Sequence, residues 1–391
     1  MQKADIYPSD DSRSKAARTT GAASPDHDMA GLVAGLIAGL SVTRLGAIAI
    51  VTLDRAAKRN AIDSQMRRTL TDALAGLADD PMVYGILIRA AGGSLAQARP
   101  FSAGGDIVEL YHQVQCGPEV ARANIMAEHA LVWSLECFNK PTVSFIDGTV
   151  IGSGVGLTLY GTHRVAGPGY RFQMPETAIG LCPDVGVAHV FARMPREIGT
   201  YLGLTGRAID RADALHLGLA THCIAAEHFA GIETAFAGAE PIDPLLDDRH
   251  EPPGPAPLDA HADTIERCFG APTVEEIVAR LGARTADRDW CAGVIADLGG
   301  RSPLALKVAL RHIRRARHLD LRQTLAVDHR IASRLLVAPD FAQAVRARLI
   351  ERTAAPRWQP LRLEDVSEAM LDRVFAAMPG SELVLPTLQE M

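Results

Sequence analysis

The chain lacks three features that would each indicate a particular class of protein. Its six cysteines lie far apart and none forms a Cys-x-x-Cys pair, which favours reduced cytosolic thiols over a disulfide framework or a zinc site. Its net charge of −6 argues against nucleic acid as the main partner, although a local basic patch for an anionic ligand is still allowed. The apolar run at residues 29–40 is too short to span a bilayer and lacks the basic flank of a targeting signal. These absences favour a cytoplasmic protein with no membrane partner.

What is present is an ordinary soluble composition in a long chain. With 391 residues, of which 48% are hydrophobic and 22% charged, the chain can bury a large core and carry an appendage. Residues 1–28 are polar, small and mixed in charge, which predicts disorder, and Met29 is an alternative translation start. We therefore expect residues 1–40 to form a disordered extension in front of the folded part.

Hydrophobic periodicity predicts strands that alternate with helices, and so an α/β layered core at residues 41–239. Strands are expected at 47–53, 83–89, 142–146, 164–166 and 171–173, and helices after Asp63 or Ser64 and at 120–138. A proline-rich connector at 240–258 separates this core from a helical region at 259–391, with helices expected at 273–281, 303–317, 319–336 and 341–351. No internal repeat is present.

Two glycine-rich turns stand at junctions between a loop and a helix. The first contains Gly104 and Gly105, and the second has glycines at 152, 154 and 156 around Ser153. At such junctions free backbone N–H groups point outward, and two of them converging on one point would form an oxyanion hole. The alternative is that each is only a tight turn. The second turn does not have the Gly-x-Gly-x-x-Gly spacing of dinucleotide-binding proteins.

The segment 173–186 is the most informative part of the chain. It places Glu176 and Asp184 eight residues apart, each after a proline, with an almost wholly apolar span between them. Burial and like-charge proximity move carboxyl pKa values toward neutrality, which suits acid/base work. The alternative is that both are loop carboxylates that cap helices, and for an isolated Pro-Asp the capping role of Asp184 is the favoured one.

The order of these motifs resembles the crotonase (enoyl-CoA hydratase/isomerase) superfamily, and within it most closely the 3-hydroxyisobutyryl-CoA hydrolases. The likeness runs from Val51-Thr-Leu-Asp and Asn60-Ala through the Gly-Gly-Asp turn to Pro-Glu-Thr and Pro-Asp-Val-Gly. It continues into the helical region, as far as Pro356-Arg-Trp. The resemblance implies a crotonase-like ββα-spiral core with a helical C-terminal extension.

The resemblance also implies roles for individual residues. Glu176 and Asp184 are catalytic, and the backbone N–H groups of Gly105 and Ser153 form the oxyanion hole, although Ser153 stands where the family usually has glycine. Glu128 binds substrate. Hydratases of the superfamily carry a second glutamate where this chain has Gly156, whereas Asp184 occupies a position that is aspartate in the hydrolases.

Lys58 and Arg59 stand where members of the superfamily often meet the phosphates of coenzyme A. The alternative is a solvated turn. The resemblance thus implies an acyl-CoA substrate and hydrolysis of a short 3-hydroxyacyl-CoA thioester, with 3-hydroxyisobutyryl-CoA from valine breakdown favoured. No cofactor or metal is expected, because coenzyme A is part of the substrate and its thiolate is a good leaving group. Two alternatives are an enoyl-CoA hydratase or isomerase and a catalytically silent acyl-CoA-binding protein. A homo-oligomer is left open.

Overall fold

The computed structural model describes residues 35–92, 100–352 and 355–387 of the chain. These residues belong to one compact unit, Leu32–Met391. The expected disorder of residues 1–28 and the alternative start at Met29 lie outside the described residues.

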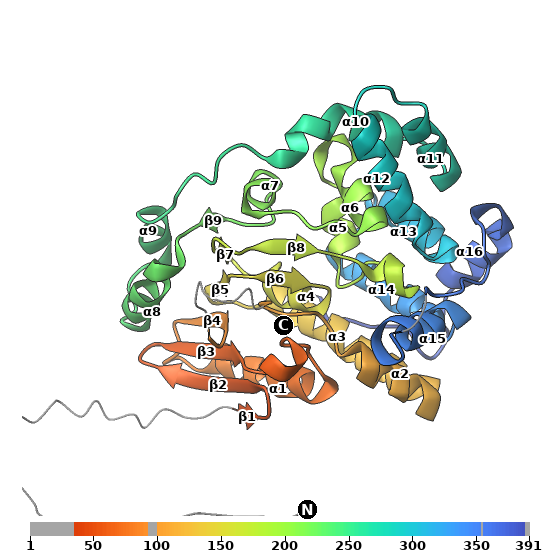
Figure 1. The fold of residues 1–391 in the computed structure, drawn as a ribbon. Coiled ribbons are helices and arrows are strands. Elements are labelled where there is room, and N and C mark those ends of the chain that lie inside the picture. Colours follow the sequence, from red (N-terminus) through yellow and green to blue (C-terminus); the bar gives the residue numbers. More distant parts are fainter. Residues whose placement is uncertain (1–34, 93–99, 353–354, 388–391) are drawn as a thin grey trace, which may run out of the picture. The chain divides into compact units, whose positions relative to one another are not determined.

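A seven-stranded sheet forms the centre of this unit, in the order β1-β2-β3-β4-β5-β7-β9 (Figure 1). The pairs β1-β2 and β2-β3 are antiparallel, whereas β3, β4, β5, β7 and β9 run parallel. Strands β6 and β8 form a separate parallel pair. The bounds are β1 (Gly35–Ile37), β2 (Leu40–Leu45), β3 (Ile48–Leu53), β4 (Gly85–Ala90), β5 (Thr142–Ile146), β6 (Thr149–Ile151), β7 (His163–Ala166), β8 (Arg171–Gln173) and β9 (His222–Cys223).

Alternation along β3 shows how the two faces of the sheet are covered. Ile48 and Ile50 pack with buried residues of α8 (Phe229–Ala237) and α9 (Ile242–Asp247). Ala49 and Val51 belong instead to the larger core, which includes α1 (Ser64–Asp79) and α3 (Pro118–Glu136). A parallel sheet buried on both faces needs apolar side chains at consecutive positions, as this strand has.

Asp63 is the N-cap of α1, where its side chain accepts the Met66 N–H at 2.8 Å. Of the two candidate caps, Asp63 and Ser64, the structure therefore uses Asp63.

The remaining elements of the first part of the chain are shorter than α1 and α3. The other bounds are η1 (Ala56–Lys58), α2 (Ile107–Cys116), α4 (Ser153–Thr158), η2 (Glu176–Ile179), α5 (Val187–Phe191), η3 (Pro195–Glu197), α6 (Ile198–Thr205), α7 (Arg211–His216) and η4 (Ala226–His228).

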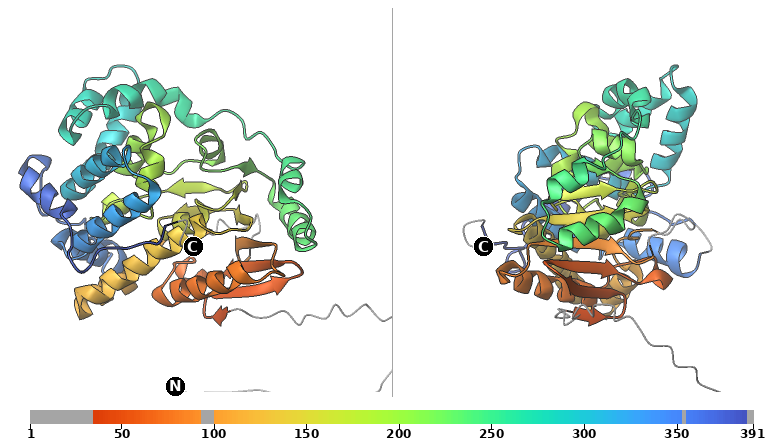
Figure 2. Two further views of the ribbon diagram at one scale, coloured as in Figure 1. Left: turned by 180° about the vertical axis from the view of Figure 1, so that it is seen from behind. Right: turned by 90° about the vertical axis from the view of Figure 1, so that its left-hand side faces the viewer.

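The C-terminal region is helical, as expected. Its elements are η5 (Pro257–His261), α10 (Ala262–Phe269), α11 (Val274–Gly282), α12 (Arg288–Gly299), α13 (Pro303–Ala316), α14 (Leu321–Leu335), α15 (Pro339–Val345), the π-helical turn η6 (Arg346–Ile350), η7 (Leu363–Asp365) and α16 (Glu368–Phe375). Helix α14 packs along α3, α13 packs on α5 and α6, and α15 packs on η2. In Figures 1 and 2 this region lies on the opposite side of the strands from α8 and α9. The C-terminal helices thus cover the segment that carries both candidate carboxylates.

The α/β class and the expected strands are confirmed, with ends that differ by one or two residues. Two boundaries differ more. Strand β1 pairs with β2, so regular structure begins at Gly35, before the boundary that we placed after residue 40. The proline-rich connector at 240–258 contains α9, because Ile242, Leu245 and Leu246 bury themselves against the sheet.

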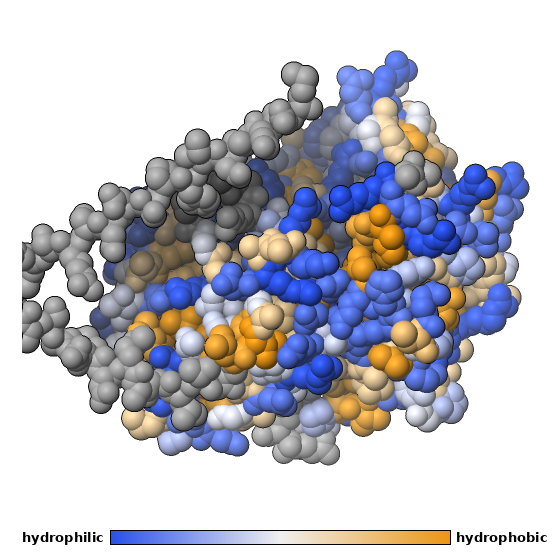
Figure 3. All heavy atoms as spheres, turned by 60° about the horizontal axis from the view of Figure 1, so that its bottom comes forward, coloured by the Kyte–Doolittle hydropathy of each residue, from blue (hydrophilic) through white to orange (hydrophobic). Residues whose placement is uncertain are grey.

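On the face of the molecule shown in Figure 3, hydrophobic residues lie in small groups among hydrophilic ones. Such a mixture is ordinary, since much of any folded surface is apolar. Within the described ranges, no helix combines the length and the apolar character that crossing a membrane requires.

Candidate active site

The two glycine-rich turns meet, and the free backbone N–H groups there include those of Gly105 and Ser153. Ile62 and Gly105 form a parallel β-bridge. The N–H of Ile62 donates to Gly104 O, and the N–H of Asp106 donates to Ile62 O, so the N–H of Gly105 between them points away from Ile62. Ser153 is the first residue of α4, where N–H groups have no partner within the helix. Neither N–H has an acceptor among the described residues.

Close approach explains the glycine at position 105. A Cβ atom there would stand 2.9 Å from Ser153 Oγ and 3.1 Å from an Arg67 guanidinium nitrogen. A side chain there would therefore displace the Ser153 hydroxyl or the Arg67 guanidinium from its place. Two free donors on touching turns meet the first requirement of an oxyanion hole, which is that the donors be unpaired and near one another.

Glu176 begins η2 and is buried, with 8% of its surface exposed. Its Oε1 atom lies 2.9 Å from the point where a Cβ on Gly152 would stand, so the carboxyl adjoins the second glycine-rich turn. Its Oε2 atom is buried and has no hydrogen-bond partner among the described residues. Burial raises the pKa of Glu176 to about 8, and the charges of Asp184 and Glu128 act in the same direction.

Asp184 does not cap a helix. Helix α5 has Gly186 as its N-cap and no side-chain capping bond. The carboxylate Oδ2 of Asp184 instead lies 3.4 Å from Nε2 of His129, which is fully buried on α3. Burial raises the pKa of Asp184, and Glu128 raises it further, whereas the hydrogen bond and charge of His129 act against this shift. The capping alternative is therefore wrong for Asp184.

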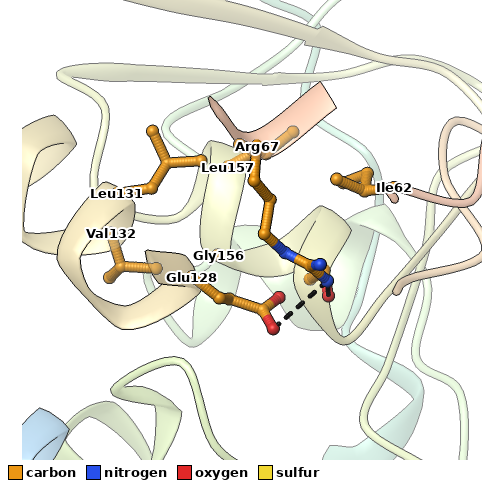
Figure 4. Close-up of a pocket in the computed structure, with 8 residues that line it drawn as sticks. Ile62, Arg67, Glu128, Leu131, Val132, Gly156 and Leu157 are labelled. Atoms are coloured by element: carbon orange, nitrogen blue, oxygen red, sulfur yellow. Dashed lines mark hydrogen bonds and ion pairs between the residues drawn. The ribbon is translucent and has the colours of Figure 1, made fainter. Parts of the chain in front are cut away.

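Glu128 lies on α3 and forms an ion pair with Arg67, with 3.3 Å between its Oε2 and a guanidinium nitrogen (Figure 4). Arg67 also donates to Asn124 Oδ1 at 2.8 Å and to Ser153 Oγ at 3.4 Å. Two atoms of this ion pair are buried and have no hydrogen-bond partner among the described residues: the donor Arg67 Nε and the acceptor Glu128 Oε1. Buried polar atoms are normally satisfied, so the two unpaired atoms mark a place where a polar ligand would be stabilised.

A small pocket opens beside this ion pair. Its apolar lining comes from Ile62, which precedes α1, and from side chains of α3 and α4, with Arg67, Glu128 and Ser153 as its polar members (Figure 4). Its lining residues are Ile62, Arg67, Glu128, Leu131, Val132, Ser153, Gly156 and Leu157. At about 10 Å³ this pocket has room for roughly one water molecule, so an acyl group could enter it only if the lining side chains moved apart.

Arg67 and His129 were missed by the sequence reasoning, although a signal for each was present. Arg67 stands three residues before Leu70 on α1, which places a charged side chain on the buried face of that helix. His129 stands four residues after Ile125 and is likewise on the buried face of α3. A charged or titratable residue on the apolar stripe of a helix is costly unless it is paired, and both are paired here.

Lys58 is the last residue of η1, and Arg59 follows it directly. Both are exposed, and neither side chain has a hydrogen bond or ion pair among the described residues. The charge of Lys58 contributes to lowering the pKa of Asp106, the neighbour of Gly105. The pair of cations therefore stands at the edge of the first glycine-rich turn, within reach of an anionic ligand.

Cys182 lies between the two carboxylates but is unsuited to be a nucleophile. Burial raises the pKa of its thiol well above the usual value, and the charges of Asp328, Asp184 and Glu176 raise it further. The thiol therefore stays protonated and fills space in the core. Across the described ranges, no group of three or more His, Cys, Asp or Glu side chains is arranged to hold a metal ion.

Comparison with known proteins adds an independent observation. Residues 48–375 match the family model described as enoyl-CoA hydratase/isomerase. The chain is 33% identical over 357 residues to a protein named probable 3-hydroxyisobutyryl-CoA hydrolase 2 from Arabidopsis thaliana, covering 87% of this chain and 92% of that protein. It is 31% identical over 354 residues to the mitochondrial 3-hydroxyisobutyryl-CoA hydrolase of Xenopus tropicalis, covering 88% of this chain and 90% of that protein.

Solved structures with other names share the fold. A carnitinyl-CoA dehydratase from Mycobacterium thermoresistibile superposes with a TM-score of 0.83 at 31% identity, covering 88% of this chain and 98% of that one. An enoyl-CoA hydratase from Rhodobacter sphaeroides gives a TM-score of 0.82 at 31% identity, covering 89% and 100%. The crotonase-like fold and the resemblance inferred from the motifs are thus confirmed.

Proposed function

Because the chain belongs to the enoyl-CoA hydratase/isomerase family, we propose that it hydrolyses a short 3-hydroxyacyl-CoA thioester. The favoured reaction converts 3-hydroxyisobutyryl-CoA to 3-hydroxyisobutyrate and coenzyme A, a step of valine breakdown. Relatives that carry the name of this hydrolase match the chain over most of its length. The observation that carries the proposal is that the buried carboxyl of Glu176 adjoins the second glycine-rich turn, while the half-buried Asp184 is near enough for its charge to raise the pKa of Glu176.

The free N–H groups of Gly105 and Ser153 would stabilise the negative charge that develops on the thioester oxygen. Donors fixed in place before the reaction cost no reorganisation when that charge appears. The thioester carbonyl would then lie at the junction of the two turns, next to Glu176. Glu128 and Arg67, which lie next to Ser153, would contact the polar end of the acyl group.

Two chemical routes are open to Glu176. As a nucleophile, its carboxylate attacks the carbonyl carbon, the C–S bond breaks, coenzyme A leaves as a thiolate that takes up a proton, and water then hydrolyses the acyl-enzyme anhydride. As a general base, it takes a proton from a water whose oxygen attacks the same carbon. Single turnovers in ¹⁸O-labelled water separate the routes, because only the nucleophilic route can leave ¹⁸O in the Glu176 carboxyl.

The site is less suited to hydration of an enoyl-CoA. Where the resemblance implies a second glutamate in hydratases, this chain has Gly156. A Cβ on Gly156 would stand 3.0 Å from Val132 Cγ2 and 3.1 Å from Val185 Cβ, so a longer side chain would not fit without displacing both valines. Hydratase activity is nevertheless a second candidate, because the two solved structures with the reported TM-scores are named as a hydratase and a dehydratase.

One experiment separates these functions. The purified full chain is incubated with 3-hydroxyisobutyryl-CoA, 3-hydroxypropionyl-CoA and crotonyl-CoA, while free thiol and enoyl absorbance are recorded. We expect thiol release from the 3-hydroxyacyl thioesters and no loss of enoyl absorbance. Asp184→Gly should abolish thiol release without creating hydration. Loss of enoyl absorbance without thiol release would support the hydratase, and binding without either change would support a silent binding protein.

Three further expectations belong to the same proposal. The reaction should need no metal or cofactor, and a chelator should leave the rate unchanged. All six cysteines are free, which supports a reducing compartment. We favour the cytoplasm, and imaging of the tagged full chain distinguishes it from the mitochondrion, the compartment in the name of the Xenopus relative. Association into a homo-oligomer is tested by sedimentation over a range of concentrations.

A further inference from the structure

The turn that follows Asp184 has a strained backbone. Val185 has φ of +52°, a left-handed conformation that is unfavourable for a β-branched residue. The next residue, Gly186, has φ of +77°, and a Cβ there would stand 2.5 Å from both Leu321 Cδ1 and Tyr160 Oη. Strain of this kind persists only where the surroundings hold the backbone in place.

Three hydrogen bonds hold this turn. The hydroxyl of Tyr160 donates to Val185 O at 2.9 Å. The N–H of Gly186 donates to Asp328 Oδ2 at 2.7 Å, and the N–H of Val187 donates to Asp184 O at 3.0 Å. The first two partners come from outside the turn, one from the residues after α4 and one from α14.

Asp328 is itself fixed by the C-terminal region. Its other oxygen, Oδ1, lies 2.5 Å from Nε2 of His312 on α13, and both side chains are fully buried. A buried carboxylate that uses one oxygen for each partner cannot turn without losing a hydrogen bond. The backbone of the turn is thus tied to two helices that are remote from it in the sequence.

The turn is next to the candidate chemistry. Asp184 precedes it directly, and the charge of Asp328 is among the influences on the pKa values of both Asp184 and His129. The site described above makes no direct use of Asp328 or His312.

We propose that Asp328, fixed by His312, is a positioning residue that holds the strained Val185–Gly186 turn and so directs the Asp184 carboxylate toward His129. This role of the C-terminal helices rests on the proposed thioester hydrolysis. It predicts that the C-terminal region is required for turnover and not only for folding. A misplacement of about 1 Å at a reacting group can cost on the order of 100-fold in rate, so a small shift of the turn is enough.

The test compares Asp328→Ala with a matched control, Asp213→Ala. Asp213 is also a buried aspartate that accepts a backbone N–H from a distant segment, that of Leu258 at 2.9 Å. It is on α7, and within the part of the chain that the structure describes no interaction links it to the carboxylate site. Both variants should lose thermal stability. Only Asp328→Ala should lower kcat, by roughly 10-fold or more with KM changed less than about twofold, since the substrate contacts are retained.

Two more variants keep the test decisive if Asp328→Ala folds poorly. Asp328→Asn retains one oxygen that can accept the Gly186 N–H, so it should recover most of kcat. Tyr160→Phe removes only the bond to Val185 O and should lower kcat by a smaller factor. Equal kcat in folded Asp328 and Asp213 variants would overturn the proposal.

Hydrogen exchange at Gly186 provides a readout that does not depend on catalysis. Its amide should be protected in the parent and should exchange faster in Asp328→Ala. If exchange is faster in Asp328→Ala but the parent has no thioesterase activity, the proposed function is refuted and the role of Asp328 in holding the turn stands. Unchanged exchange in Asp328→Ala would refute that role itself.

Discussion

Nε2 of His129 lies 3.4 Å from Oδ2 of Asp184, which makes a buried imidazole the direct neighbour of the second candidate catalytic carboxyl. Burial alone would lower the pKa of His129, but the hydrogen bond and charge of Asp184, with the charges of Asp328 and Glu128, raise it. Since each group shifts the titration of the other, the apparent pKa values belong to the pair. The proton state of Asp184 therefore depends on a residue that does not itself need to touch substrate.

Replacing His129 should change the pH dependence of turnover. His129→Asn removes the imidazole that opposes the raised pKa of Asp184, so that pKa should rise further. The acidic limb of kcat/KM should then move to higher pH, with a smaller change at alkaline pH. His329→Asn is the control, because its ring packs edge-on against His129 with centroids 6.3 Å apart and makes its own hydrogen bond to Ser381 O. Superimposable profiles for the His129 variant and the parent would contradict this coupling.

Glu176 should limit stability as well as support activity. Its pKa is raised from 4.5 to about 8, so the folded state binds more protons than the unfolded state between these values. The stability that this group contributes is thus present below about pH 4.5 and is lost as the pH rises toward 8.

Glu176→Gln should lower turnover by roughly 100-fold or more, the scale of losing an acid/base group.

The same variant should melt at a higher temperature than the parent under alkaline conditions. The gain should be on the order of a few kcal/mol near about pH 9 and should vanish near about pH 5, where the parent carboxyl is protonated. Melting curves over this range measure it. A gain that is independent of pH would show that the Glu176 carboxyl is not the group responsible.

Arg67 and Glu128 should be coupled in stability. Their side chains are only 5% and 8% exposed, so Arg67→Met would leave Glu128 as a buried charge without its partner, at a cost of about 3–5 kcal/mol. Adding Glu128→Gln should recover much of this loss, because the second change removes the unpaired charge. Arg89→Met is the comparison, since the Arg89–Glu233 pair is partly exposed and should contribute about 1 kcal/mol or less. If the losses in the free energy of unfolding from Arg67→Met and Glu128→Gln simply added in the double variant, the two side chains would not interact.

The sequence predicted the layers of this fold because its periodicities are strong and local. The strand at 142–146 follows directly from an apolar run before a turn. The start of α1 follows from two capping residues, Asp63 and Ser64, before an amphipathic stripe, and the structure shows that Asp63 is the cap. What periodicity could not supply is tertiary. Strand β1 forms only because β2 offers it a partner, and α9 forms within a proline-rich stretch because its apolar residues meet the far face of the sheet.

For the site, the motifs identified the candidate residues but not their neighbours. Asp184 looked like a helix cap because Pro-Asp favours one locally, and only the packing of α3 against the loop brings His129 to it. The hydrogen bond from the Gly186 N–H to Asp328 joins residues 142 positions apart, a separation at which no local sequence pattern carries information. The catalytic roles of Glu176 and Asp184 stay predictions that the variants above test.

The exposed cations at the first glycine-rich turn should matter for binding and not for chemistry. Lys58 and Arg59 are exposed, without side-chain partners among the described residues, so an anionic ligand would not have to displace an existing ion pair. Replacing both by Ala should raise KM with little change in kcat, because a contact with the phosphates of coenzyme A is the same in the ground and transition states.

The control for that variant is the double change of Arg267 and Arg288 to Ala, which removes equal charge from exposed positions on α10 and α12. Kinetics at low and high ionic strength complete the test. The rise in KM should be largest at low salt and should shrink as the salt screens the phosphate contact. A similar rise for the control would show that KM follows the net charge of the molecule. An unchanged KM for the Lys58 and Arg59 variant at low salt would leave them as the solvated turn that the sequence also allowed.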